Sequence, residues 1–155
     1  MPVDCITEVI DMVQKIVVNH CYGGFGLSPL AQKRYLELIG KECYFYKQTK
    51  WAHENNGVAI YNRISVEDAK DGFMSFAHTI DCGEVVNEFP KDDGYWYDHD
   101  IERDDPILIR VIEELGKLAN EKYSNLEIVE IPDGVEWQIE EYDGNEHVAE
   151  KHRTW

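Results

Sequence analysis

The sequence predicts an α+β fold, a single domain in which two main helices pack on a mixed, mostly antiparallel sheet. Three observations support this class. The length of 155 residues suits one domain. Two amphipathic segments carry the start signals of helices, and several short segments rich in β-branched and aromatic residues are bounded by turn residues. Strand–helix–strand order occurs only twice, which argues against a doubly wound parallel sheet.

The first forty residues predict a short helix, a strand and the first main helix, in that order. Apolar residues at helical spacing predict a helix over 3–14, as an extension at the N-terminus of the domain, and residues 16–18 read as a strand. The main helix spans 28–39, since Ser28 is a favoured N-cap and Pro29 suits the first turn, where a backbone N–H has no helical partner.

The middle of the chain predicts three strands and a long irregular stretch. Residues 43–46 and 58–61 read as strands joined by a turn at 54–57, and strand character returns at 95–97. Glycine and proline interrupt residues 65–94, and the apolar spacing there is irregular. Because a loop of this length in a compact domain is usually functional or mobile, we expect it to be an insertion that serves as a lid or an oligomer contact.

The second main helix follows the irregular stretch and one more strand. Asp105 is the expected N-cap, and Pro106 occupies the first helical position. Apolar residues at helical spacing then supply one buried face, and Asn120 is expected to end the helix.

The C-terminal part predicts a strand followed by a hairpin. Residues 126–131 read as a strand, and residues 135–139 alternate strictly between apolar and polar, as in a strand with one wet face. Asp143 and Gly144 are typical of a two-residue hairpin turn, after which residues 146–152 return along the preceding strand.

The negative charge is concentrated in the second half of the chain. Residues 1–80 hold 9 acidic and 8 basic side chains, whereas residues 81–155 hold 22 acidic and 7 basic ones. Nearly all of the net charge of −16 therefore lies in the second half. Such a surface repels long nucleic acids and anionic membranes unless a local basic pocket intervenes. It suits cationic partners, so one function class is an acidic interaction protein that mimics a nucleic acid or inhibits a basic protein.

Cysteine usage and hydropathy indicate a cytoplasmic protein. The four cysteines are widely spaced and form no CxxC pair, so they read as small buried side chains in a reducing compartment. The first residues lack the basic stretch of a secretory signal. No apolar run approaches the roughly 20 residues that a membrane span needs. We expect neither a metal nor a cofactor.

The main candidate site is the glycine-rich turn between strand 16–18 and helix 28–39. Glycines let backbone N–H groups approach an anion closely, the start of a helix favours phosphate, and the two aromatic side chains could stack a base. The turn has no Walker lysine and no complete dinucleotide-binding fingerprint, so a tight structural connection is the alternative interpretation. The candidate ligand-binding residues are Tyr22, Gly23, Gly24, Phe25, Gly26 and Ser28.

The last five residues are expected to supply the cations that the turn lacks. They follow nine acidic residues, and no lysine or arginine, between positions 127 and 150. Arg153 offers a planar fork to phosphate, and Trp155 offers a stacking face. The alternative is a tail whose tryptophan fills an apolar gap and whose cations offset neighbouring acids. The leading hypothesis is therefore a site made by the turn together with Arg153 and Trp155.

A second candidate site is an acidic cluster just before the second helix. Asp98, His99 and Asp100 could together hold a divalent ion, which would suit a small metal-assisted hydrolase. On an extended segment His99 points away from the two carboxylates, and Asp105 is better explained as a helix cap. The six histidines show no catalytic spacing either, so no catalytic or metal residue is assigned.

Three segments form a specific combination: CYGGFGLS at 21–28, ERDDP at 102–106 with EELG at 113–116, and IPDGVEW at 131–137 with EEYDG at 140–144 and VAEKHRTW at 148–155. This combination resembles an uncharacterised family of small phage and prophage proteins. The resemblance covers residues 16–40 and 95–155. It implies an accessory phage protein that acts in the host cytoplasm, including evasion of nucleotide-signalled defence. The family has no assigned activity, so no catalytic role is carried over from it.

Three function hypotheses follow, in order of preference. The first is a non-enzymatic binder of a small nucleotide-like ligand that sequesters a host defence signal. The second is an acidic interaction protein that mimics a nucleic acid or inhibits a basic host protein. The third is a small metal-assisted hydrolase. In each case we expect no long nucleic acid and no membrane as a partner, and a homo-oligomer could complete the site.

Overall fold

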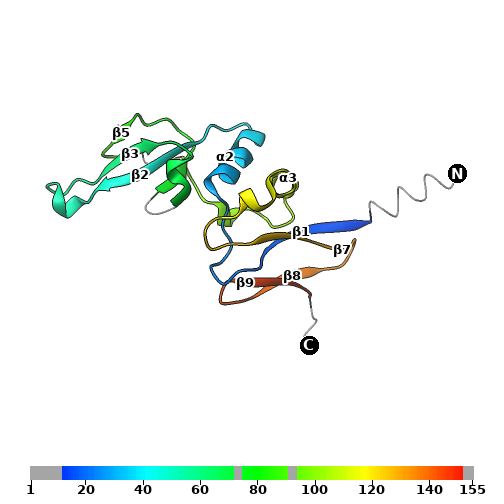
Figure 1. Ribbon diagram of the computed structural model, residues 1–155. Helices are drawn as coiled ribbons and strands as arrows, with labels where there is room; N and C mark the ends of the chain where they lie inside the picture. The colour runs from blue at the N-terminus through cyan, green and yellow to red at the C-terminus, as the bar shows by residue number, and fades with distance from the viewer. Residues whose placement is uncertain (1–11, 72–74, 91–93, 152–155) are drawn as a thin grey trace.

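Two α-helices lie between separate groups of strands in the computed structural model (Figure 1). The structure describes residues 12–71, 75–90 and 94–151. The predicted α+β class and single domain are confirmed, with two main helices. The described strands form three sheets, and every strand pair in them is antiparallel, whereas the sequence predicts one mixed sheet.

The first sheet pairs β1 (Val13–Asn19) with β7 (Leu126–Pro132). Helix α3 (Pro106–Leu115) contacts both strands, and the hairpin formed near the C-terminus lies on the other side of them (Figure 1). Most of the helix expected over 3–14 lies outside the described residues, and its last two residues already belong to β1.

The second sheet is the hairpin of β8 (Trp137–Tyr142) and β9 (Asn145–Glu150). Its turn is formed by Asp143 at φ 52° and Gly144 at φ 88°, which confirms the predicted two-residue hairpin. The first strand begins two residues later than expected, because residues 133 and 134 form the turn after β7 and residues 135 and 136 precede the pairing.

The third sheet has five strands in the order β5–β3–β2–β4–β6. Two of them lie inside residues 65–94, which the sequence predicts as an irregular insertion or lid. Strand β4 is interior to this sheet, since it pairs with β2 on one side and with β6 on the other. The strands are β2 (Tyr44–Lys50), β3 (Ile60–Ile64), β4 (Ser75–His78), β5 (Val85–Val86) and β6 (Tyr95–Trp96).

Both helices begin as the sequence predicts. In α2 (Pro29–Leu38) the Ser28 hydroxyl accepts the Ala31 N–H at 3.2 Å, and in α3 the Asp105 carboxylate accepts the Ile107 N–H at 2.8 Å. Four short 3₁₀ helices accompany them in the described part of the chain: η1 (Ala52–Glu54), η2 (Asp68–Asp71), η3 (Asp98–Asp100) and η4 (Gly116–Ala119).

Helix α3 ends five residues earlier than the sequence predicts. Gly116 adopts φ 56°, a left-handed value that breaks the α-helical hydrogen bonding. The chain continues as η4 as far as Ala119, so Asn120 still closes the helical stretch. Neither described helix is long and apolar enough to cross a membrane.

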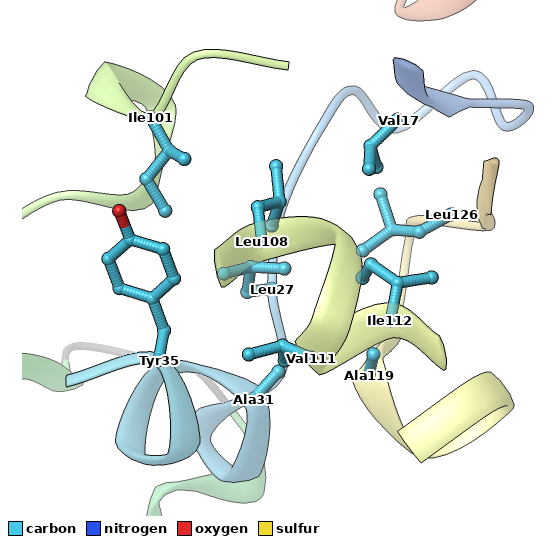
Figure 2. Close-up of a cluster of buried hydrophobic side chains, with 10 residues drawn as sticks. All are labelled: Val17, Leu27, Ala31, Tyr35, Ile101, Leu108, Val111, Ile112, Ala119 and Leu126. Carbon is cyan, nitrogen blue, oxygen red and sulfur yellow. The ribbon is translucent and has the colours of Figure 1, made fainter. Parts of the chain in front are cut away.

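The main core lies where α2, α3 and the ends of β1 and β7 meet. Figure 2 shows its side chains converging on one another from these elements. Trp96 packs against this core and also against the smaller cluster around Phe45, so it joins the five-stranded sheet to the helices. The buried residues are Val17, Leu27, Ala31, Tyr35, Ile101, Leu108, Val111, Ile112, Ala119 and Leu126.

Candidate functional site

The predicted glycine turn lies at a junction of loops that is organised by Asn19. This side chain is fully buried. Its amide group donates to the carbonyl oxygens of Cys21 and Gly144 at 2.7 and 2.8 Å, and its oxygen accepts the Asn125 N–H at 2.8 Å. One residue at the end of β1 thus binds the glycine turn, the β8–β9 turn and the loop before β7.

The glycines of the turn permit close contacts with neighbouring loops. A Cβ on Gly23 would lie 2.1 Å from the Tyr123 carbonyl oxygen, and one on Gly26 would lie 2.8 Å from the carboxyl carbon of Glu121. Gly24, at φ 90°, is the only one of the three with a left-handed conformation. The turn is therefore packed against residues 121–124 along much of its length.

Carboxylates occupy the end of the turn that leads into α2. The Leu27 N–H donates to the Asp98 carboxylate at 2.7 Å. The Glu121 carboxyl group packs against Gly26, although the residue as a whole is exposed. Burial of that carboxyl and the nearby charge of Asp98 raise the pKa of Glu121 above its ordinary value. A phosphate at this end of the turn would meet two carboxylates.

The two aromatic residues of the turn differ in their surroundings. The guanidinium of Arg103 lies 3.8 Å from the centre of the Phe25 ring, so that one face of the ring is already covered. Tyr22 is 64% exposed and remains accessible for stacking. Arg153 and Trp155, the predicted second half of this site, lie outside the described residues.

Ser28, also among the predicted site residues, lines a different feature, which we call the lysine groove. It consists of two adjoining cavities beside the start of α2, of about 400 and 650 Å³. Both cavities are lined by Pro29, Lys70, Glu121 and Lys122. Cavities of this size are typical of sites for small organic ligands.

The two cavities have different additional walls. Phe45, Phe76 and Tyr123 give the smaller one an aromatic lining. The larger one is lined by aliphatic side chains and by further charged groups. These residues are Leu30, Val66, Leu118, Glu67 and Lys117, together with Ser28 and Asn120.

Three lysines converge on the groove from separate segments, namely Lys70 from η2, Lys117 from η4 and Lys122 from the loop after it. Among the described residues, the one ion pair made by a lysine is that of Lys15 with Glu113. The three groove lysines therefore have no described carboxylate at ion-pair distance. They outnumber the two groove carboxylates in a protein of net charge −16.

The acidic cluster before α3 has mainly structural contacts. Asp98 binds the Leu27 N–H, and the ring nitrogens of His99 lie 3.9 Å from carboxylate oxygens of Asp98 and Asp100. Within the described ranges, no group of three or more histidine, cysteine or acidic side chains is arranged to hold a metal ion.

The amino-acid sequence does not predict the lysine groove, although it contains one weak signal of it. Lys117 and Lys122 are the only lysines among residues 92–150, which are otherwise strongly acidic. The sequence hypothesis used the same contrast, basic residues next to an acidic stretch, to single out the last five residues instead. Lys70 lies in the stretch with no clear pattern, so nothing in the sequence places it beside the other two.

Comparisons with known proteins do not assign the chain to a family. No protein-family model, no curated protein and no solved structure matches it. The function is therefore inferred from the groove and its charges, and the resemblance to phage proteins stays a prediction.

Proposed function

We propose that this protein binds a small nucleotide-like ligand in the lysine groove and does so without catalysis. The observation that carries this proposal is the convergence of Lys70, Lys117 and Lys122, without described acidic partners, on two cavities of ligand size. In a strongly acidic protein, unpaired cations in a concave site favour an anionic ligand over a structural role.

The start of α2 contributes a favourable field but few hydrogen bonds. The N-terminus of a helix carries partial positive charge, which attracts phosphate. However, Pro29 has no N–H, and the Ala31 N–H already donates to Ser28. The lysines therefore supply the direct phosphate contacts, and the helix adds to the potential.

The aromatic lining of the smaller cavity suits the base of a nucleotide. Phe76 is partly buried, whereas Tyr123 is 60% exposed and has the Lys122 ammonium 5.4 Å from the centre of its ring, so that a cation and an aromatic face lie side by side in this wall. Stacking of a base on an aromatic ring is tolerant of base identity and contributes about 1–3 kcal/mol. The groove thus combines cations and aromatic rings, the two features that the sequence hypothesis assigned to the glycine turn and the C-terminal residues.

Sequestration of a nucleotide signal in the host cytoplasm is the biological role that we infer, in line with the resemblance to phage proteins. A binder that lowers the free concentration of a signal needs affinity and no turnover. The acidic surface around the groove would keep long nucleic acids away by charge repulsion while leaving a small site usable.

Isothermal titration calorimetry with GMP, AMP, NAD and a cyclic dinucleotide tests this function. At least one should bind, and Lys70→Gln, Lys117→Gln and Lys122→Gln should each weaken its binding. Lys50→Gln, in the exposed end of β2 away from the groove, is the matched control and should bind as the wild type does. Added salt should lower the affinity because the contacts are between charges. Absence of binding by the folded wild-type protein at millimolar ligand would refute the proposal.

A second candidate function is capture of a basic protein by the C-terminal hairpin. Tyr142 is 79% exposed beside the exposed acids Glu141 and Asp143. Tyrosine next to carboxylates is suited to arginine, through cation–π contact and ion pairing. Affinity capture with wild-type protein and with Tyr142→Ala separates this function from ligand binding, because the hairpin does not line the groove.

A further inference from the structure

Glu121 occupies a fixed position in the wall common to both cavities of the groove. Its backbone N–H donates to the Ser124 hydroxyl at 2.9 Å, and that hydroxyl donates to the Gly26 carbonyl oxygen at 2.7 Å. Ser124 is buried. These two hydrogen bonds attach the Glu121 backbone to the glycine turn, and the carboxyl group lies against Gly26 in the wall of both cavities.

The carboxyl group of Glu121 has no partner of its own. In the part of the chain that the structure describes, no hydrogen bond or ion pair reaches it, and it is packed against Gly26. Burial and the charge of Asp98 raise its pKa, which means that the ionised form is short of stabilising contacts. A ligand that donates hydrogen bonds to this carboxylate would supply what the protein does not.

The groove therefore has two complementary requirements. Lys70 and Lys122 line both cavities together with Glu121, and their positive charges favour an anionic group of the ligand. Glu121 requires hydrogen-bond donors, and a carboxylate accepts two parallel N–H donors best. Among nucleobases, guanine presents such a pair on its Watson–Crick edge, at N1 and the 2-amino group. Adenine presents an unprotonated N1 there, which would face the carboxylate with a lone pair.

We propose that Glu121 reads the base and that the groove selects guanine nucleotides over adenine nucleotides. This inference rests on the proposed function, since it assigns a ligand class to the same groove. The base lies in the smaller, aromatic-lined cavity with its N1 edge toward Glu121. The phosphate lies at the lysines that this cavity shares with its neighbour.

Calorimetric titration at pH 7.5 with GMP, IMP and AMP tests the selection. GMP offers both donors, IMP offers N1–H alone, and AMP offers neither at that position. Affinity should fall in this order, with GMP at least about tenfold tighter than AMP, as expected for a hydrogen bond to a charged group. Glu121→Gln should reduce the ratio of GMP to AMP affinity toward one while AMP binding is retained. Glu136→Gln, an exposed acid outside the groove, is the matched control.

The outcomes separate this inference from the proposed function. If GMP and AMP bind equally well and both depend on Lys122, the base selection is wrong and the nucleotide-binding function stands. If GMP, IMP and AMP all fail to bind and the other probes fail too, the proposed function is wrong and the selection falls with it. The comparison of nucleotides uses the wild-type protein, so it does not depend on the folding of a variant.

Discussion

Arg103 and Glu146 form a bidentate ion pair that links the segment before α3 to β9. Two guanidinium nitrogens of Arg103 lie 2.5 and 2.7 Å from the carboxylate oxygens of Glu146, and both side chains are largely buried. Glu146 also accepts the Asn19 N–H at 2.8 Å, and Arg103 stacks on Phe25. The pair therefore holds the glycine turn, β1 and the C-terminal hairpin in one arrangement.

Loss of Glu146 should destabilise the protein strongly. Glu146→Ala leaves the Arg103 charge buried and unpaired, so the free energy of unfolding should fall by about 3–5 kcal/mol. Urea denaturation at pH 7 measures it. The matched control is Glu113→Ala, which removes the exposed partner of Lys15 and should change the midpoint far less. Similar losses in the two variants would contradict the structural role of the buried pair.

Two glycines with the same backbone conformation should differ in their tolerance of alanine. Gly144 and Gly134 have φ 88° and 82°. A Cβ on Gly144 would lie 2.5 Å from the Gly24 nitrogen, whereas one on Gly134 would have no atom within 4 Å. Gly134→Ala should cost about 1–2 kcal/mol through backbone strain alone, and Gly144→Ala should cost about 1–3 kcal/mol more through overlap. Thermal unfolding of the two variants gives the comparison, and equal losses would show that the hairpin turn does not pack on the glycine turn.

Acid should weaken the contact between the two helices. Hydrogen bonds from Arg34 on α2 and Arg110 on α3 lower the pKa of Glu114 to about 2. A lowered folded-state pKa means that the associated stability is complete above the ordinary value of 4.5 and is lost as the pH falls toward about 2. Carboxyl titration by NMR should show Glu114 ionised at pH 4. The control is Arg34→Gln, which should move the pKa of Glu114 upward, and an unchanged titration would exclude the ion pair in solution.

Glu121 should make the protein less stable at neutral pH than at acidic pH, the reverse of the effect of Glu114. Because its pKa is raised in the folded state, the folded protein holds this proton more tightly than the unfolded chain does. This stability is complete below the ordinary value of 4.5 and is lost as the pH rises from there through the raised folded-state pKa, so the ionised carboxyl is unfavourable at pH 7. Glu121→Gln should raise the midpoint of urea denaturation at pH 7 and have little effect at pH 3.5. A variant less stable than the wild type at pH 7 would show that Glu121 has a stabilising partner.

Local signals were sufficient to predict where the two helices begin and where the hairpin turns. Ser28, Asp105 and the Asp143–Gly144 pair act through hydrogen bonds and torsions within a few residues, and the structure confirms each of them. The α+β class also follows from such segments. These features depend on neighbours in the sequence, which is why one sequence is enough to find them.

Long-range contacts explain what the sequence could not predict. Strands β4 and β5 have four and two residues, too few to show a period, and they gain their stability by pairing with β2 and β3. The glycine turn reads as an open anion site because its neighbours, Glu121 and Tyr123, are distant in the sequence. The lysine groove likewise needs the fold to bring its three cations together.

The pairing of β1 with β7 determines how late during translation the first sheet can form. Val13 lies opposite Pro132, so the first described strand has no sheet partner until β7 has been synthesised and has left the ribosome. At about 5–20 residues per second, several seconds of synthesis separate the two strands. Throughout that interval Ile16, Val17 and Val18, which are fully buried in the finished protein, remain uncovered by β7. A premature stop before residue 126 would therefore leave a product that cannot form this sheet and cannot cover these side chains with β7.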